Sequence, residues 1–189
     1  MSWLKRLVAA LILIIVVGIV FLLTSQKFLR SAFPVHYVPE VRTGAERYGL
    51  DPYLVLAVLR VESNYDPLAL SKPGARGLMQ ILPETGVWIA EIKGETDFHP
   101  DDLYLPELNI DYGAWYLDYL LKMFNGDVHL VLASYNAGLG RVKRWLAEES
   151  WDGRPETVNA IPVLETRLFV RKVLTIKSLY QQIYPNLFP

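Results

Sequence analysis

A glutamate at the end of an apolar segment is the first residue in this sequence that could carry out acid–base chemistry. The segment 52–62 reads PYLVLAVLRVE and ends at Glu62. Three apolar residues share the face of Glu62 in a helix, because they precede it by seven, four and three positions: Val55, Val58 and Leu59. Burial beside such side chains disfavours the carboxylate and raises its pKa. A carboxyl that keeps its proton near neutral pH can act as a general acid.

A glutamate near a helix end can also be simply solvated, so the residues that follow Glu62 matter. Residues 63–86 read SNYDPLALSKPGARGLMQILPETG, and their prolines and glycines predict a loop that returns towards the helix end. Gly77 has no side chain, which predicts the close approach of a ligand to its backbone. Met79 and Gln80 lie beside it. This loop is therefore the predicted wall of a ligand site.

A second polar group stands at another helix end. Tyr135 and Asn136 come just before Gly138, where an amide can reach into a cleft. From the residues alone, Tyr135 also fits an ordinary core aromatic. Met79 likewise fits a filler of the core.

Other kinds of site have no support in the sequence. It contains no GxGxxG, GxxxxGK[ST], GxSxG or HExxH motif, and its three histidines are scattered. The absence of cysteine excludes disulfides, thiolate metal sites and thiol catalysis. We therefore expect neither a metal nor another cofactor.

Helices must position these groups. The chain after residue 38 shows helical spacing of apolar residues and no strand-like alternation. Asp51-Pro52, Pro83 and Pro106 predict helix starts, and Asp127 predicts the N-cap of a helix over 128–137. A last helix is predicted from about 162 to 183. The predicted fold class is all-α, in a single domain.

The first 30 residues have a different composition. Residues 7–23, LVAALILIIVVGIVFLL, lie in a stretch without charge between Arg6 and Lys27. About 20 helical residues span the roughly 30 Å of bilayer hydrocarbon, which predicts a transmembrane anchor. The alternative is a cleaved signal peptide, but that usually has a shorter apolar core and a small-x-small cleavage site. The predicted organisation is an N-terminal stub and anchor over 1–30, a juxtamembrane linker over 31–44 and a domain over 45–189 that holds the candidate acid.

The net charge of the chain indicates which classes of partner it can bind. The first 30 residues carry four basic groups and no acidic one, so the remaining chain has 15 basic and 20 acidic side chains. A net charge near −5 argues against a nucleic-acid partner.

Taken together, these residues resemble the soluble lytic transglycosylase (SLT) family of peptidoglycan-cleaving enzymes, which has a goose-type lysozyme-like helical fold. The matching strings are ESNYDP from Glu62, GLMQ at 77–80, SYNAG at 134–138 and ETR at 165–167. They occur in the family's order and at its usual separations, over roughly residues 45–180. The departures are Leu82, Ser134 and Leu139, and none of them touches the proposed acid.

The resemblance implies roles for particular residues. Glu62 would be the sole catalytic acid and base, and Ser71 would lie near its carboxyl. Tyr135 would form a hydrogen bond near that carboxyl. Glu165 would lie in the cleft wall and Arg167 would be structural, although the two also fit a plain ion pair. The complete set of implied substrate-binding residues is Ser71, Gly77, Met79, Gln80, Tyr135, Asn136 and Glu165.

The resemblance also implies a reaction that needs one carboxyl. Protonated Glu62 would donate to the oxygen that links N-acetylmuramic acid to N-acetylglucosamine. The ionised Glu62 would then accept the proton of the muramic acid 6-hydroxyl, which attacks its own anomeric carbon and leaves a 1,6-anhydro end. Intramolecular attack benefits from a high effective molarity.

Two alternatives stay open at this point. One is a muramidase that hydrolyses the same bond, and the other is a membrane-anchored peptidoglycan-binding scaffold without turnover. A peptidoglycan substrate implies a single-pass protein of the bacterial cell membrane, with its N-terminus inside and its domain facing the wall. The charges on either side of the anchor leave that orientation nearly tied. Besides the glycan strands and the lipid bilayer, other proteins of the cell envelope are compatible partners.

Overall fold

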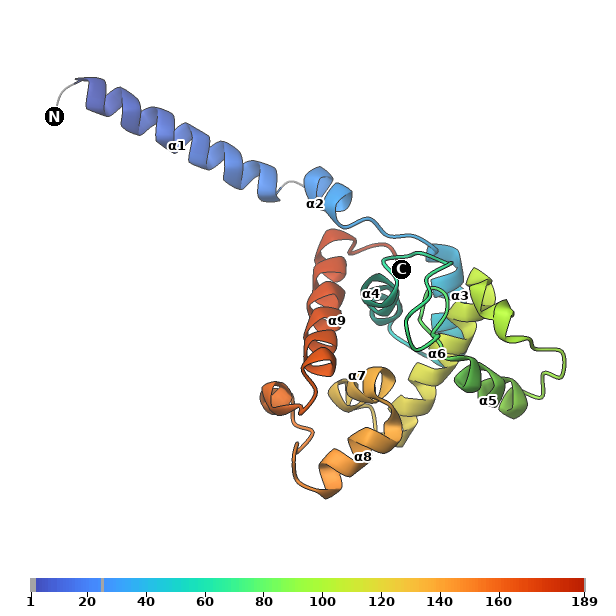
Figure 1. The fold of residues 1–189 in the computed structure, drawn as a ribbon. Coiled ribbons are helices and arrows are strands. Elements are labelled where there is room, and N and C mark those ends of the chain that lie inside the picture. Colours follow the sequence, from blue (N-terminus) through green and yellow to red (C-terminus); the bar gives the residue numbers. More distant parts are fainter. Residues whose placement is uncertain (1–2, 25, 189) are drawn as a thin grey trace. The chain divides into compact units, whose positions relative to one another are not determined.

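The computed structural model describes residues 3–24 and 26–188 (Figure 1). The chain divides into two compact units, one up to Val35 and the other from His36 onward. Each unit is described here by itself.

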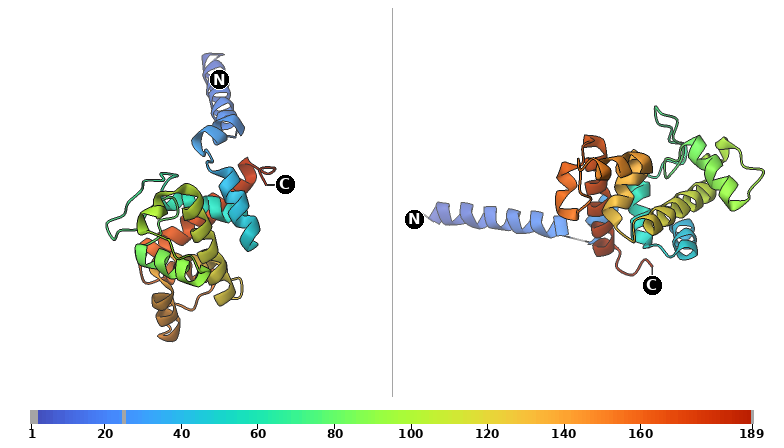
Figure 2. Two further views of the ribbon diagram at one scale, coloured as in Figure 1. Left: turned by 90° about the vertical axis from the view of Figure 1, so that its right-hand side faces the viewer. Right: turned by 90° about the horizontal axis from the view of Figure 1, so that it is seen from below.

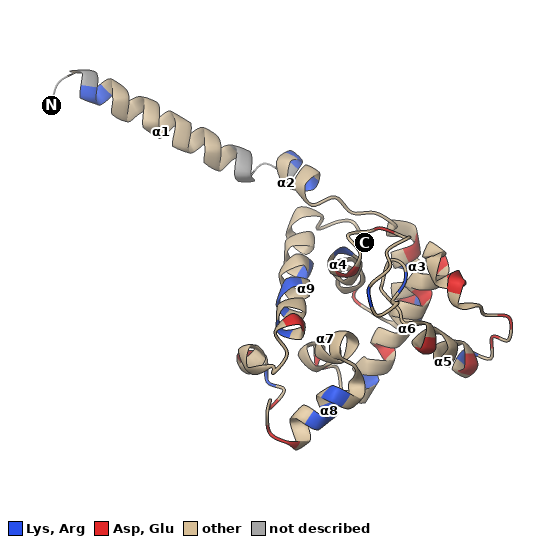
Figure 3. Cartoon of the chain, viewed as in Figure 1, with Lys and Arg blue, Asp and Glu red and all other residues tan. Residues whose placement is uncertain are grey.

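The first unit consists of helices α1 (Trp3–Thr24) and α2 (Gln26–Ala32). Basic residues lie near the beginning of α1, and the rest of its described length carries no charge (Figure 3). The predicted anchor at 7–23 includes Leu22 and Leu23, whose side chains lie outside the described residues. In the part of the chain that the structure describes, no helix has the length and apolar character of a membrane span. The predicted transmembrane helix is therefore not supported by the structure.

The second unit is helical, as predicted. Apart from isolated bridges that pair Arg76 with Leu70 and with Ile81, its described residues form no β-structure. Its elements are α3 (Val38–Tyr48), α4 (Pro52–Glu62), α5 (Pro83–Lys93), the 3₁₀ helix η1 (Pro100–Tyr104), α6 (Pro106–Met123), α7 (Val128–Ala137), α8 (Leu139–Ala147), the 3₁₀ helix η2 (Pro155–Ala160) and α9 (Leu164–Ile183).

Helix α4 lies in the middle of this unit (Figures 1 and 2). The Asp51 carboxylate caps it by accepting a hydrogen bond of 2.9 Å from the Tyr53 N–H. All residues from Tyr53 to Leu59 are buried, because α4 packs against both α3 and α9. A helix that is apolar nearly all round thus proves to be a central one, as its sequence predicts. It ends at Glu62.

Helix boundaries mostly follow the predicted signals. The helices α5 and α6 begin at Pro83 and Pro106, and the Asp127 side chain accepts from two backbone N–H groups at the start of α7. The main difference is α3, because the sequence predicts a linker up to residue 44. In the structure α3 begins at Val38 and buries Val41, and a Cβ at Gly44 would contact α6. Apolar packing against α6 draws this segment into the domain.

Candidate active site

Glu62 is the last residue of α4 and its side chain is mostly buried. Burial raises the pKa of this carboxyl to about 8, with a further contribution from the negative charge of Glu165. Among the described residues, no hydrogen bond or ion pair reaches the carboxyl. A proton on Glu62 is therefore retained at neutral pH, which agrees with the prediction from its apolar face.

Glu165 lies in the first turn of α9, the helix that packs against α4, and its side chain is exposed. Its charge acts on Glu62, so the two carboxyls are near each other. Arg167 does not neutralise Glu165. Instead, its Nε and Nη2 donate to the Ile161 carbonyl at 3.2 and 2.9 Å, which makes it a structural residue and leaves the ion-pair alternative unsupported.

The structure shows a packing role for Gly77. This residue is buried with φ of +73°, and an added Cβ would overlap the Leu103 carbonyl oxygen and lie 2.5 Å from Asn109 Nδ2. The space where a side chain would stand is therefore filled by the protein itself, and the predicted contact of the Gly77 backbone with a ligand stays a prediction. Glycine is required here because of tight internal packing.

Met79 also differs from its predicted role. Its side chain has 0% exposure and packs against Gly113 of α6, where an added Cβ would lie 2.7 Å from Met79 Cε. A side chain in this position cannot contact a glycan, so the core-filler alternative is correct. The backbone of Met79 is nevertheless important, because its N–H donates to Asn109 Oδ1 at 2.7 Å and its carbonyl accepts from the Tyr135 hydroxyl at 2.8 Å.

Asn109 is a positioning residue that the sequence analysis misses. It is fully buried on α6, and its Nδ2 donates to the carbonyls of Arg76 and Leu103 at 2.9 and 2.7 Å. With the bond from Met79, one amide side chain thus satisfies three backbone groups of the loop and of η1. The available signal was an amide residue on the buried face of an amphipathic helix, next to Ile110.

Tyr135 sits at the end of α7 with its ring 5.5 Å from Tyr116 and 6.4 Å from Phe169, as measured between centroids. Burial, followed by the charge of Glu62, holds the pKa of its hydroxyl well above the usual value. Tyr135 is thus close to Glu62, but its hydroxyl donates to the Met79 carbonyl. This bond fixes the loop at 77–80, and a role of Tyr135 towards the Glu62 carboxyl stays a prediction.

Other predicted residues meet in a pocket of about 170 Å³. Asn136 lines it, and its Oδ1 accepts a 2.8 Å bond from Thr166 of α9. Gln80 donates from Nε2 to the carbonyls of Ala69 and Gly77, at 3.1 and 2.9 Å. The complete lining is Gln80, Ile81, Leu82, Thr85, Tyr116, Tyr135, Asn136, Ala137 and Gly138. Two of the four sequence strings, GLMQ and SYNAG, therefore meet at this pocket.

Ser71 is not part of this lining. Its hydroxyl accepts a hydrogen bond of 2.9 Å from the Ala75 N–H, which stabilises the turn at Pro73-Gly74. Its predicted place near Glu62 stays a prediction.

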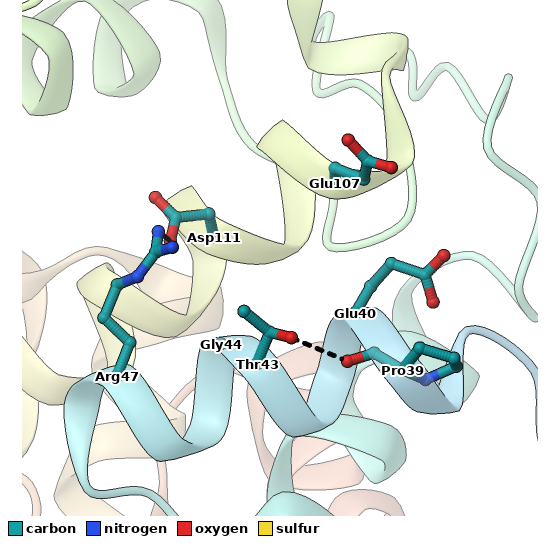
Figure 4. Close-up of a pocket in the computed structure, with 7 residues that line it drawn as sticks. All are labelled: Pro39, Glu40, Thr43, Gly44, Arg47, Glu107 and Asp111. Atoms are coloured by element: carbon teal, nitrogen blue, oxygen red, sulfur yellow. Dashed lines mark hydrogen bonds and ion pairs between the residues drawn. The ribbon is translucent and has the colours of Figure 1, made fainter.

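A larger pocket, of about 350 Å³, lies between α3 and α6 (Figure 4). None of the residues predicted for the site lines it. The Arg47 guanidinium extends to the Asp111 carboxylate, and the Thr43 hydroxyl donates to the Pro39 carbonyl at 3.0 Å. The charged groups Arg47 and Asp111 thus hold the helices together. Nor does any cluster of three or more acidic or histidine side chains in the described part of the chain form a potential metal site.

The comparison with protein families decides the classification, because the transglycosylase SLT domain model matches residues 40–157. The chain belongs to the transglycosylase SLT domain family. This confirms the resemblance drawn from the four strings. The SLT match contains Glu62, the loop at 77–80 and Tyr135-Asn136, whereas Glu165 lies beyond it.

Relatives of this SLT chain are larger proteins. It is 34% identical to the soluble lytic murein transglycosylase of Salmonella typhimurium over 81% of this chain and 24% of that one. Over 57% of this chain and 33% of the relative, it is 39% identical to membrane-bound lytic murein transglycosylase C of Yersinia pestis. The crystal structure of the 70-kDa soluble lytic transglycosylase from Escherichia coli matches with a TM-score of 0.75 and 30% identity, over 86% of this chain and 27% of that one. The chain thus spans about a quarter to a third of the length of these relatives.

Proposed function

We propose that this protein is a peptidoglycan lytic transglycosylase. It cleaves the β-1,4 bond between N-acetylmuramic acid and N-acetylglucosamine without water and leaves 1,6-anhydro ends. The observation that carries the proposal is the state of Glu62, a mostly buried carboxyl with a pKa of about 8 that forms no ion pair with any described residue. Membership of the SLT family and the names of the relatives support the same reaction.

One carboxyl performs both proton transfers in this reaction. Protonated Glu62 donates its proton to the bridging oxygen, which leaves as a hydroxyl of N-acetylglucosamine. Positive charge develops at the anomeric carbon and is stabilised by the N-acetyl group of the muramic acid. The ionised Glu62 then accepts the proton of the 6-hydroxyl as that oxygen bonds to the anomeric carbon. Glu62 is protonated again at the end, so the reaction consumes no water.

The surrounding residues have separate tasks in this proposal. Asn136 and Gln80 line the pocket and bind polar groups of the sugar. Tyr135 positions the loop at 77–80 through the Met79 carbonyl, and Glu165 keeps the pKa of Glu62 high. Ser71 near the carboxyl remains part of the proposal.

We further propose that the N-terminal segment anchors the protein in the bacterial cell membrane, with the domain facing the wall. The apolar run at 7–23 has the composition of an anchor, and one relative is named as membrane-bound. Alkaline extraction of membranes tests this point, because an anchored chain stays in the pellet. A version that lacks residues 3–24 should then appear in the supernatant.

The decisive experiment for the reaction is mass spectrometry of the fragments that the full chain, in detergent, releases from purified peptidoglycan. We expect muropeptides with anhydro ends, each one water lighter than a hydrolysed product, and none from Glu62→Gln. Reducing ends would instead identify a hydrolytic muramidase. Binding to the peptidoglycan without any release would identify a scaffold.

A further inference from the structure

Four aromatic side chains of α5 and α6 form a cluster, here called the aromatic platform: Trp88, Trp115, Tyr116 and Tyr119. The Trp88 ring lies 5.3 Å from Trp115, 6.1 Å from Tyr116 and 5.1 Å from Tyr119, between centroids. Trp115 and Tyr119 are stacked at 5.6 Å with 10° between their planes. All four side chains are partly exposed, so the platform presents ring surface to solvent.

The platform continues the pocket that Tyr135 and Asn136 line. Tyr116 belongs to both, and its ring lies 5.5 Å from Tyr135. Thr85 also lines the pocket, and Trp88 follows it by one turn of α5. Tyr119 follows Tyr116 by one turn of α6. Residues three apart share a helix face, so both helices carry aromatic rings from the pocket lining one turn farther.

The hydroxyl and indole N–H groups of the platform differ in their hydrogen bonding from those of buried aromatic residues. Two fully buried aromatic residues have protein partners: the Tyr112 hydroxyl donates to Glu95 at 2.5 Å, and the Trp151 indole donates to Thr157 at 3.2 Å. In the described part of the chain, no protein group bonds to the indole N–H or hydroxyl of any platform residue, and none of these atoms is among those buried without a partner. They are therefore left to solvent or to a ligand.

We propose that the aromatic platform binds further sugar residues of the glycan strand whose cleavage is proposed above, on which this inference rests. A pyranose ring presents C–H groups on its faces and hydroxyls at its edge. The aromatic faces of the platform can pack against the C–H groups, and its unpaired hydroxyls and indole N–H groups can form hydrogen bonds with the sugar hydroxyls. The platform itself carries no charge, as suits a neutral sugar ring. The consequence is a preference for long strands over short ones.

Binding to chitooligosaccharides, uncharged chains of N-acetylglucosamine, tests the platform separately from catalysis. Calorimetric titrations use the full chain with Glu62→Gln, so that nothing is cleaved, and compare a tetramer with an octamer. We expect Trp88→Leu and Trp115→Leu to weaken octamer binding about tenfold, which corresponds to about 1.4 kcal/mol. The loss should be smaller for the tetramer. Trp88→Phe should retain most of the affinity.

Tyr104→Leu is the matched control, because Tyr104 is a partly exposed aromatic of η1 outside the platform and outside the pocket. Its octamer affinity should equal that of the parent. Should a leucine variant lose its helical circular dichroism, Tyr119→Phe decides, with an expected loss of about threefold from one hydroxyl.

The outcomes are distinct. Unchanged octamer affinity in the folded platform variants overturns the platform, even if the wild-type chain cleaves peptidoglycan with anhydro ends. Selective loss of octamer affinity supports the platform, even if the wild-type chain proves to be inactive and the proposed reaction fails. A change from dimer to monomer in Trp88→Leu, with oligosaccharide affinity unaltered, would assign the platform to a second copy of the chain and overturn the proposal.

Discussion

Helix α6 and the end of helix α4 each hold mostly buried polar side chains, but the two regions differ in how these side chains are bonded. On α6, the Asn109 amide bonds to three backbone groups, and the Asp111 carboxylate accepts from Lys93 at 2.5 Å and from the Tyr48 hydroxyl at 3.2 Å, besides its pair with Arg47. At the end of α4, Glu62 has no such partner among the described residues, and the charge that adds to the rise of its pKa is the like charge of Glu165.

This difference distinguishes polar groups with a structural role from a polar group that can take part in a reaction. A buried polar group that is fully paired holds elements together, and its proton state is of no use to a substrate. A buried carboxyl without partners costs stability when it ionises, but it keeps a proton that it can give away. The fold therefore tolerates a local loss of stability at the residue that is proposed to react.

The largest expected effect comes from removing the unpaired carboxyl. Glu62→Gln should lower the rate of glycan cleavage by about 10²–10⁴-fold, the usual contribution of a general acid. Asp111→Asn, which changes the paired carboxylate, should leave the rate close to that of the wild type. Release of anhydro-muropeptides measures both. Similar losses in the two variants would remove the distinction between the two places.

Loss of the paired amide should come next. Asn109→Ala leaves the Met79 N–H and the carbonyls of Arg76 and Leu103 without their partner, and should reduce the free energy of unfolding by about 3 kcal/mol. Urea denaturation measures the change. Asn159→Ala, at an exposed position of η2, is the control and should be nearly neutral.

The two carboxyls should also differ in what they do to stability. Asp111→Asn should destabilise the protein by about 2 kcal/mol, less than a fully buried pair, because Lys93 loses a partner while only 18% exposed. Asp118→Asn on the same helix should cost only a few tenths of a kcal/mol, since its partner Lys122 is 76% exposed.

Glu62→Gln should instead stabilise the protein, and only above acidic pH. Its pKa is raised from 4.5 in the unfolded chain to about 8 in the fold, so the wild type loses stability as the pH rises from 4.5 to 8. The glutamine variant lacks this loss, and its thermal midpoint should exceed that of the wild type at pH 9 but not at pH 4. Equal midpoints at pH 9 would contradict a buried, unpaired acid.

The smallest effect should come from the like charge. Glu165→Gln removes one of the two causes that raise the pKa of Glu62, so the alkaline limit of activity should move to lower pH. Burial, the larger cause, remains. The pH profile of glycan cleavage shows the shift, and activity at pH 5 should change little. A profile that does not move would place Glu165 outside the reach of Glu62.

Local signals in the sequence were sufficient for the starts of α4, α5, α6 and α7 and for the burial of Glu62. Asp51, Pro83 and Asp127 act on the backbone within a few residues, and the apolar face of Glu62 belongs to its own helix. The strings of the SLT family identified the loop at 77–80. The directions of its side chains were not predictable, because they depend on residues far along the chain.

Met79 points into the core because Gly113 leaves it room, and Gly77 is required because Leu103 approaches it. Both contacts join segments that are more than 20 residues apart. The positioning role of Asn109 was not predictable for the same reason, since its partners lie on the loop and on η1. Motif spacing thus predicted that the GLMQ and SYNAG strings come together, but long-range packing decided which of their side chains line the pocket.

The bond from the Met79 N–H to Asn109 also has a kinetic consequence. Loop amides ordinarily exchange their hydrogens with solvent through small local motions. The Met79 N–H is hydrogen-bonded to a side chain of α6, so its hydrogen can exchange only when the loop and α6 separate. The loop at 77–80 should therefore open as one cooperative unit with α6, and stay as still as the core between those rare openings.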